Sequence, residues 1–227
     1  MANTNLIATK MKTSTHQKGL IICGTDTDVG KTVVSSFFVE GLQAVYWKPI
    51  QSGLEENTDT TTVASLLNLS SKRYIPEAYK FKAPVSPHWA AEKENKCINP
   101  QNLTLPLSNN FIVIETAGGL MVPITRNWLQ IDQLKVWNLP IILVARSGLG
   151  TLNHTLLSLE ALKQRDIKVN GIVLNGPLHQ DNPKTLKEFG RVPILAELPT
   201  FDNVNIEVLR KEWKKQNLSV KVKGMFS

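Results

Sequence analysis

Residues 19–42 read GLIICGTDTDVGKTVVSSFFVEGL, and this stretch decides the fold. An apolar run, Gly19–Cys23, is followed by the glycine-bearing segment GTDTDVGKT at 24–32 and then by a helix-like run, Val33–Leu42. This order predicts a buried strand, a loop and a helix. The backbone N–H groups of the loop and of the first helical turn have no acceptor within the helix, so they can converge on an anion such as a phosphate. The stretch therefore predicts a nucleotide-binding protein.

The end of this loop adds chemistry of its own. Lys31 brings a positive charge, and Thr32 brings a hydroxyl to the position that holds magnesium in the usual phosphate loop. In the usual spacing, G-x-x-x-x-G-K-[ST], the first glycine would stand one residue after Gly24. An ordinary glycine-rich turn between a strand and a helix is the alternative. Asp26 and Asp28 are unexpected beside phosphates, and could instead contact magnesium, a cationic substrate group or the ribose.

The composition is that of a globular protein. The chain has 227 residues, of which 42% are hydrophobic, enough for one domain with a sizeable core. We expect residues 1–18 to form a flexible N-terminal extension and residues 19–227 to form a single domain. The extension is polar and lacks the apolar core of a signal peptide, and no segment has the length of a membrane span. Cys23 and Cys97 have neither a zinc nor a disulfide spacing, so we expect a cytoplasmic protein without a membrane partner.

The formal net charge of +7 raises the question of nucleic acid binding. The basic residues are dispersed, with one concentration at Arg210–Lys215 and in the tail after it, and aromatic residues do not alternate with them as in a stacking surface. A solvated helix face explains the concentration better, and the preference for anions is better assigned to ATP. We therefore expect no nucleic acid partner.

Apolar, β-branched runs alternate with helix-like stretches along the chain. The runs lie at 19–23, 44–47, 111–114, 139–145, 168–174 and 192–195, and the helix-like stretches at 32–43, 58–68, 129–137, 151–165, 182–189 and 203–216. This alternation is typical of a parallel sheet covered by helices on both faces, so we predict a doubly wound α/β fold with a mostly parallel sheet. Residues 70–110 contain several prolines and no long periodic pattern, and we interpret them as loop with short helices over the functional edge. An insertion without function is the alternative.

Charged residues stand where these runs end, and ligands of such sheets bind at the carboxyl ends of strands. Lys48 follows the second run and should point into the same crevice as Lys31, where two lysines suit a reaction that accumulates negative charge on oxygens. Glu115 ends the third run, and Asp59 opens a helix. Together with Thr32, these carboxylates offer the oxygen ligands that Mg²⁺ prefers. Taken singly, the three charged residues also fit a surface lysine, a solvated strand end and a helix-start carboxylate.

Two further run ends carry polar groups. The segment Ser147-Gly-Leu-Gly-Thr-Leu-Asn-His154 forms a second glycine-rich turn into a helix, and its basic neighbour is Arg146. Such a helix start suits a small organic anion better than a second triphosphate. Asn175 ends the fifth run and offers a donor and an acceptor to a base edge, although a simple Asn-Gly turn explains it equally well.

Six segments of the chain resemble, in this order, those of the dethiobiotin synthetase family: GTDTDVGKT, KPIQSG, PVSPH, ETAGG, GTLNH and LNG. The resemblance covers about residues 19–200 and accounts for the early Gly24, since the phosphate loop of this family has one extra residue. It implies a fold like that of P-loop NTPases. It also implies an ATP-dependent ring closure in biotin synthesis, in which diaminopelargonate, carbon dioxide (or bicarbonate) and ATP give dethiobiotin, ADP and phosphate.

The resemblance implies catalytic and metal-binding roles as well. It places Lys48 near the carbamate and the γ-phosphate, and Lys31 where it stabilises the transferring phosphoryl group. Mg²⁺ is the implied cofactor, held by Thr32, Asp59 and Glu115. Thr27 and Ser52 would contact the substrate. The family is homodimeric, with the active site at the interface, so the substrate carboxylate would be bound by residues of the neighbouring subunit's helix start, namely Gly150, Thr151 and Asn153.

The nucleotide-binding residues that the resemblance implies form a longer set. They are Asp28, Val29, Gly30, Lys31, Thr32, Val33, Asp59, Glu115, Thr116, Ala117, Gly118, Asn175, Gly176, Pro199, Thr200 and Phe201. Two of them depart from the pattern of the family: Thr116 stands where we expect glycine, and Gly176 offers no side chain beside Asn175.

Two other ATP-using classes of this fold group are alternatives. A cobyrinate-type amidotransferase synthetase would carry a glutaminase domain with a cysteine nucleophile, and Cys97 lacks that setting. A partitioning or scaffold ATPase would use the loop as a conformational switch, and such loops usually start with lysine-glycine, where this chain has Cys23 and Gly24.

Overall fold

A seven-stranded sheet forms the centre of the computed structural model, which describes residues 17–54 and 57–225. Its strands have the order β11-β10-β9-β1-β6-β2-β4, and all of their pairings are parallel. The strands are β1 (Gly19–Gly24), β2 (Val45–Trp47), β4 (Tyr74–Ile75), β6 (Ile112–Gly119), β9 (Ile141–Arg146), β10 (Val169–Asn175) and β11 (Ile194–Leu198). From β1 the chain builds one side of the sheet and then the other, which confirms the predicted doubly wound fold.

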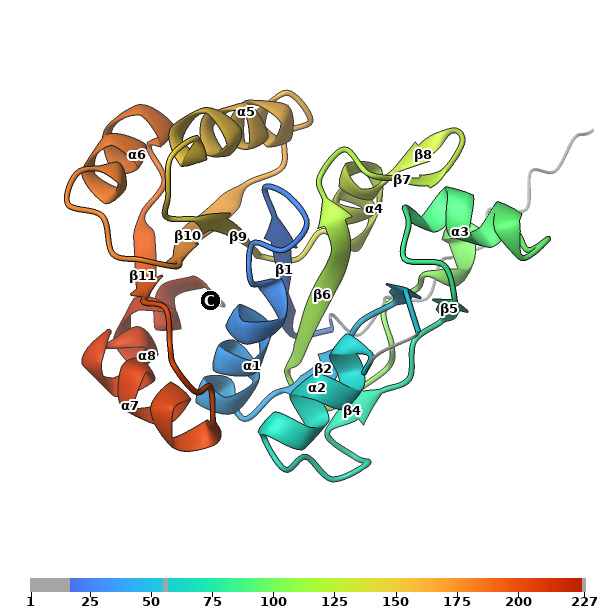
Figure 1. The fold of residues 1–227 in the computed structure, drawn as a ribbon, viewed down its shortest axis with the longest axis horizontal. Coiled ribbons are helices and arrows are strands. Elements are labelled where there is room, and N and C mark those ends of the chain that lie inside the picture. The colour runs from blue at the N-terminus through green and yellow to red at the C-terminus, as the bar shows by residue number, and fades with distance from the viewer. Residues whose placement is uncertain (1–16, 55–56, 226–227) are drawn as a thin grey trace, which may run out of the picture.

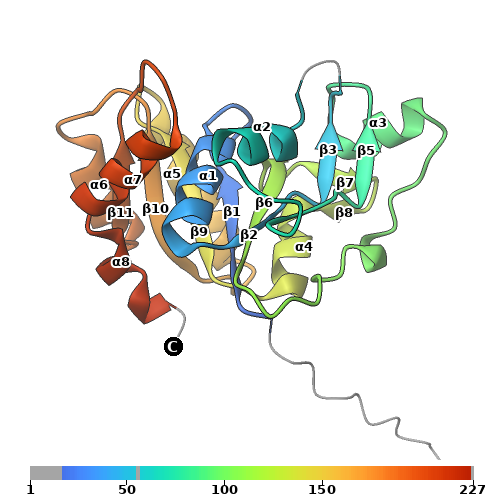
Figure 2. The same cartoon turned by 90° about the horizontal axis from the view of Figure 1, so that it is seen from below.

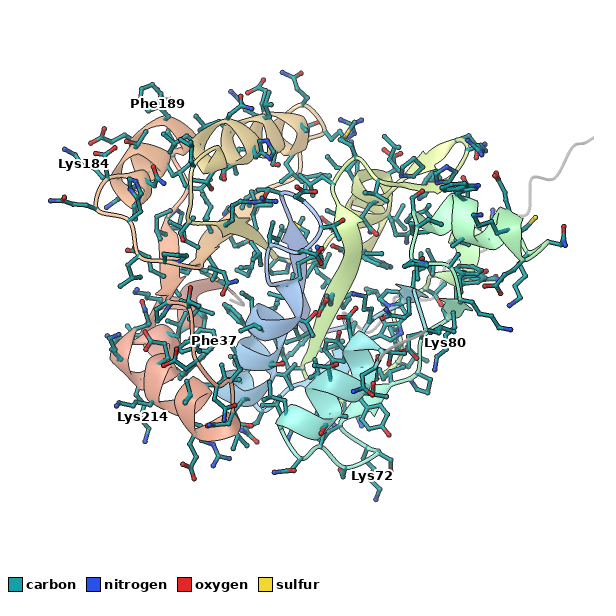
Figure 3. The ribbon with its side chains drawn as sticks, viewed as in Figure 1. Phe37, Lys72, Lys80, Lys184, Phe189 and Lys214 are labelled. Carbon is teal, nitrogen blue, oxygen red and sulfur yellow. The ribbon has the colours of Figure 1, made fainter. Side chains whose placement is uncertain are left out.

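Helices cover both faces of the sheet (Figure 1). One face carries α1 (Lys31–Leu42), α2 (Asp59–Leu66), α7 (Ile206–Lys215) and α8 (Leu218–Lys221), and the other carries α3 (Pro87–Lys93), α4 (Gln130–Trp137), α5 (Thr151–Lys163) and α6 (Asn182–Gly190). Each face has its own apolar core, because alternate residues of a strand point to opposite sides: Val45 and Trp47 belong to one core and Tyr46 to the other. Figure 3 shows Phe37 in the interior and Lys214 on the outside.

The segment 70–110 contains more regular structure than we predicted. Besides α3 and the short helix η1 (Pro100–Asn102), it contributes the edge strand β4 and the strand β5 (Tyr79–Phe81), which pairs in parallel with β3 (Ile50–Ser52). A small antiparallel pair, β7 (Pro123–Thr125) and β8 (Trp128–Leu129), and a final turn η2 (Lys223–Met225) complete the described elements. Strands of two or three residues are too short to show an alternating pattern, so periodicity does not predict them.

The prediction that Glu115 ends its strand was wrong. β6 continues to Gly119, and its register pairs Ile22 with Glu115 and Gly24 with Gly119 across an irregularity in β1. A carboxylate can lie inside a strand when buried partners satisfy it, and Glu115 has such partners.

The carboxyl edge of the sheet is the edge at which α2, β3, β5 and α3 lie, opposite the C-terminal end of the chain (Figure 2). Residues 1–16 of the predicted extension lie outside the described residues. Gln17 and Lys18 contact the chain before β6, since the Gln17 side chain donates to the Asn110 carbonyl at 3.1 Å and the Ile112 N–H donates to the Lys18 carbonyl at 2.9 Å. In the described part of the chain, no helix combines the length and apolar character needed to cross a bilayer.

Candidate active site at the carboxyl edge

A cavity of about 730 Å³ lies at the carboxyl edge of the sheet. It is bounded by the loop after β1, by the segment Lys48–Gly53 around β3, and by the segment Pro84–Pro87 that enters α3. Its volume is in the range of small-molecule sites. Charged residues line one part of its wall and apolar residues another, so it suits a ligand with a strongly polar end.

The loop after β1 ends at Gly30, which has a φ of 89°. A Cβ atom at this position would lie 2.1 Å from Nδ2 of Asn175, so both the conformation and the space require glycine. No side chain caps the start of α1, which leaves the N–H groups of its first turn available to an anion. Lys31 opens the helix, is only 7% exposed and donates from Nζ to the Asp26 carbonyl at 2.8 Å. Burial lowers the pKa of Lys31, although the Glu115 carboxylate opposes this effect.

Five side chains form a buried group that we call the Lys48 cluster: Thr32, Tyr46, Lys48, Asp59 and Glu115. Lys48 follows β2 and is 6% exposed, and its Nζ donates to Asp59 and, at 3.0 Å, to Oε1 of Glu115. The Tyr46 hydroxyl donates to the other Glu115 oxygen at 2.9 Å. Thr32 Oγ1 lies 2.7 Å from Asp59 Oδ1 and 3.0 Å from Glu115 Oε1. Glu115 is therefore fully buried and yet contacted at both oxygens.

These contacts set the charge states of the cluster. Burial by itself would lower the pKa of Lys48, but Glu115 and Asp59 outweigh burial and raise this pKa above its usual value. Burial would raise the pKa of Asp59, but Lys48 outweighs it and the pKa lies below its usual value. Burial, and then the charge of Glu115, raise the pKa of Tyr46 well above its usual value. Lys48 is thus a fixed positive charge, not a proton acceptor, and Tyr46 remains a neutral donor.

The oxygens of Thr32, Asp59 and Glu115 fit a magnesium ion. The one hydroxyl hydrogen of Thr32 cannot serve two carboxylates at once, and Lys48 supplies one positive charge to two negative ones. A hard divalent cation would satisfy this surplus of oxygen lone pairs. Within residues 17–54 and 57–225, no three His, Cys, Asp or Glu side chains converge as a metal site. The chain would therefore supply two carboxylates and a hydroxyl, and phosphate and water would supply the remaining ligands.

Sequence reasoning missed several residues of this site, among them Tyr46 and Gln51. Tyr46 stands two positions before Lys48, and the period of a strand places both on the same side, so this signal was available. Gln51 is buried, and its Oε1 accepts the backbone N–H of Asp59 at 3.2 Å, which fixes the start of α2 against β3. The sequence contains no signal for this contact, because it spans an irregular loop.

The structure brings about half of the expected site residues to the cavity. Those that line it are Thr27, Asp28, Gly30, Lys31, Thr32, Lys48, Ser52, Asp59, Glu115, Ala117 and Gly118. Those outside its lining are Val29, Val33, Gly150, Thr151, Asn153, Thr116, Asn175, Gly176, Pro199, Thr200 and Phe201. The first set includes the two lysines and the three residues expected to hold magnesium. The second includes the residues expected to contact a base or a second subunit, together with Val29, Val33 and Thr116.

The segment before α5 lies in the open. Leu149 is fully exposed, and a Cβ atom at Gly148 or at Gly150 would have no neighbour within 4 Å among the described residues. The Thr151 side chain is buried, with its hydroxyl 3.3 Å from that of Thr155. Leu149 and the two glycines beside it therefore have few contacts with the rest of the described chain, whereas Ser147 before them is buried and donates from its hydroxyl to the Pro177 carbonyl.

The ends of β10 and β11 lie together on the far side of the loop. Asn175 donates from Nδ2 to the Val29 carbonyl at 3.2 Å, and the Gly176 N–H donates to the Leu198 carbonyl at 2.9 Å. Thr116, which replaces an expected glycine, is buried, and its hydroxyl has no hydrogen-bond partner in the described part of the chain.

Comparison with known proteins agrees with this geometry. A family model described as an AAA domain matches residues 18–207. The ATP-dependent dethiobiotin synthetase BioD of Agrobacterium fabrum is 47% identical over 191 residues, which cover 84% of this chain and 90% of that protein. The biotin biosynthesis bifunctional protein BioCD of Bordetella avium is 48% identical over 200 residues, 88% of this chain, which spans only 43% of that longer protein.

Solved structures add a likeness of fold. The septum site-determining protein MinD of Pyrococcus horikoshii, in complex with Mg-ADP, superposes with a TM-score of 0.56 at 14% identity, covering 91% of this chain and 94% of that one. At this identity the likeness shows a common fold.

Proposed function

Since this chain belongs to the family of ATP-dependent dethiobiotin synthetases, we propose that it closes the ureido ring of dethiobiotin at the expense of ATP. The observation that carries the proposal is the meeting of Lys31 and Lys48 on one cavity, together with Thr32, Asp59 and Glu115. The relatives' names support ATP as a substrate and dethiobiotin as the product. Diaminopelargonate and carbon dioxide are the further substrates that the resemblance of the sequence segments implies.

The reaction proceeds in three steps. One amine of the diamine adds to carbon dioxide and loses a proton, giving a carbamate. A carbamate oxygen then attacks the γ-phosphorus of ATP, which forms a carbamic-phosphoric anhydride and releases ADP. The second amine attacks the carbonyl carbon, loses a proton and expels phosphate, and this closes the ring.

The two lysines act as charges in this scheme. Lys48 is held protonated by Asp59 and Glu115, so it stabilises the negative charge on the carbamate and on the transferring phosphoryl oxygens. Lys31 lies at the start of α1, where its charge adds to the N–H groups of the first turn. Mg²⁺, held by Thr32, Asp59 and Glu115, would neutralise charge on the outer phosphates.

The remaining walls of the cavity suit the diamine. The Ser52 hydroxyl is buried and has no hydrogen-bond partner among the described residues, so it is available to a substrate amine or carbamate, as is Thr27 at the rim. Ile50, Val85 and Val122 offer apolar surface to its carbon chain.

A second subunit completes the site in this proposal. The chain forms a homodimer in which Gly150, Thr151 and Asn153 of one subunit bind the substrate carboxylate of the other. The exposure of Leu149 and the empty space around Gly150 support this role, because the turn is accessible to a partner. The adenine base would lie toward the ends of β10 and β11, near residues 175–176 and 199–201.

The test is an assay of phosphate release from ATP with magnesium and bicarbonate, with and without diaminopelargonate, and with mass spectrometry of the product. We expect phosphate release to depend on the diamine and to be matched by an equal amount of dethiobiotin. Hydrolysis that the diamine leaves unchanged would contradict the proposal and favour a switch ATPase.

A further inference from the structure

Asp26 joins several contacts of the phosphate loop, although the proposed reaction gives it no role. Its carboxylate accepts a hydrogen bond from Arg146 Nη2 at 2.8 Å and one from the Thr27 N–H at 2.7 Å. Its carbonyl accepts the hydrogen bond from Lys31 Nζ at 2.8 Å. One residue therefore links the end of β9 to the loop and to the lysine that would meet the phosphates.

The backbone at Asp26 has little room to move toward the sheet. A Cβ atom at Gly24 would lie 2.8 Å from the Asp26 carbonyl oxygen, and one at Gly119 would lie 3.4 Å from the Asp26 Cα. The loop thus rests directly on β1 and β6. Because the same carbonyl accepts from Lys31, a displacement of this peptide would remove the partner of the ammonium group.

Arg146 and Asp26 restrain this peptide from the side of β9. Both side chains are 47% exposed, so water screens their attraction and the ion pair contributes little to the stability of the fold. Its effect is local, because the guanidinium group stands on a strand of the central sheet and the carboxylate on the loop. The pair ties a segment without regular structure to a rigid element.

We propose that Arg146 is a positioning residue for the phosphate loop: by pairing with Asp26 it holds the loop, and with it Lys31, in the form that accepts the phosphates of a nucleotide. Asp26 is thereby assigned to a cation of its own chain instead of to magnesium, the substrate or the ribose. This inference rests on the proposed function, because it takes the loop to be the ATP site.

The experiment is a double-mutant cycle on nucleotide affinity. The full-length protein and the variants Arg146→Met, Asp26→Asn and the double variant are titrated with ADP in the presence of magnesium by calorimetry. Asp26→Asn keeps an oxygen for the Thr27 N–H and removes only the charge. Arg126→Met is the matched control, because Arg126 forms a similarly exposed ion pair with Glu92 in a turn outside the loop. Thermal unfolding and the KM values for ATP and for the diamine are measured on the same samples.

Each single variant is expected to bind ADP about fivefold more weakly, which is the upper end of the effect of an exposed ion pair. The double variant should bind no more weakly than each single variant, because either substitution already removes the pair. The KM for ATP should rise equally, with the KM for the diamine and Tm unchanged, and Arg146→Lys should restore part of the affinity. Arg126→Met should bind as the unaltered protein does.

Other outcomes overturn the inference in distinct ways. Independent effects would give a loss of about 25-fold in the double variant and would show that the two side chains are uncoupled. Tighter binding by Asp26→Asn would mean that Arg146, once released, contacts the nucleotide itself. Unaltered affinity in both variants would remove the pair from nucleotide binding. A protein that binds no ADP before any substitution would overturn the proposed function, and this inference with it.

Discussion

Two parts of the carboxyl edge, the Lys48 cluster and the turn before α5, differ in how many contacts their residues make within a single chain. In the Lys48 cluster every charged group has a partner of opposite charge, and Glu115 is contacted at both oxygens without any exposure to water. The turn at residues 148–150, which we call the Leu149 turn, carries a fully exposed leucine and two glycines whose Cβ positions have open space around them.

The difference separates two tasks. Groups that stabilise developing charge must be oriented before the reaction, because reorientation during it would cost free energy, and the ion-paired cluster provides that order. A turn that recognises the remote end of a substrate can be completed by another surface, because it contributes to binding and not to the reacting centre.

Loss of the lysine charge should affect the cluster most. Lys48→Gln is expected to lower kcat by about a thousandfold, the upper range for removal of one preorganised donor, and to leave the Kd for ADP nearly unchanged. Steady-state kinetics and calorimetry measure the two quantities. Lys80→Gln is the control, since Lys80 is also ion-paired but half exposed, on β5 (Figure 3).

The Lys48→Gln substitution leaves Glu115 buried without its cation, so the folding of this variant must be checked by thermal unfolding. Lys48→Arg keeps the charge and serves as the second variant, with a turnover expected between those of Lys48→Gln and the unaltered protein. Full turnover in a folded Lys48→Gln protein would remove this lysine from the mechanism.

A charge on the Leu149 turn should affect assembly and substrate binding only. Leu149→Asp is expected to shift the protein toward monomers in analytical ultracentrifugation and to raise the KM for the diamine about 30-fold, as for loss of an interface contact worth about 2 kcal/mol. The Kd for ADP should not change, because the phosphate loop belongs to the same chain. Leu107→Asp, at an almost fully exposed leucine elsewhere, is the control. An equal rise in the KM for the diamine in Leu149→Asp and Leu107→Asp, or no rise in either, would contradict the distinction between the two parts of the edge.

Gln51 tests how the position of Asp59 within the Lys48 cluster is maintained. Gln51→Met removes the acceptor for the Asp59 N–H, and the cost of an unsatisfied group predicts about a tenfold rise in the magnesium concentration for half-maximal activity. Magnesium-dependent ADP binding should shift in parallel. Gln164→Met, which alters an exposed glutamine directly after α5, is the control. An unchanged magnesium dependence would show that Asp59 keeps its position without Gln51.

The cysteines should give the smallest effect on activity. Burial raises the pKa of Cys23 to about 12, even though Lys31 nearby opposes the shift, whereas Cys97 is exposed. A thiol reagent such as DTNB should therefore label one cysteine in the native protein and two after denaturation. Modification of Cys97 should change turnover by less than about twofold, as for a surface change far from any site. Labelling of Cys23 in the native state would show that the strand beneath the phosphate loop opens.

The sequence predicted the fold, and the gathering of several charged residues at one edge of it, for one physical reason. Parallel strands bring their carboxyl ends to one edge, so Lys31, Lys48 and Glu115 could be placed together from the runs that precede them. The same reasoning ended β6 too early, because a charged residue after an apolar run looks like a strand end when its buried partners are not visible.

Contacts that depend on the path of loops could not be predicted from the sequence. The Asp26–Arg146 pair joins residues 120 positions apart, and the Gln51–Asp59 bond depends on how an irregular segment turns. The edge strand β4 has two residues, too few for a periodic signal. The sequence therefore did not predict the contacts that restrain the site, whereas it did single out most of the residues proposed to carry its chemistry.

The ion pairing of Lys48 also protects the protein from its own product chemistry. The proposed reaction generates an activated acyl phosphate within reach of amino groups, and a neutral lysine there would be carbamoylated irreversibly. An ammonium group has no lone pair to attack with, so Lys48, held between two carboxylates, is chemically inert toward that electrophile. Asp59 and Glu115, which keep Lys48 positively charged, thus also prevent it from attacking the activated intermediate.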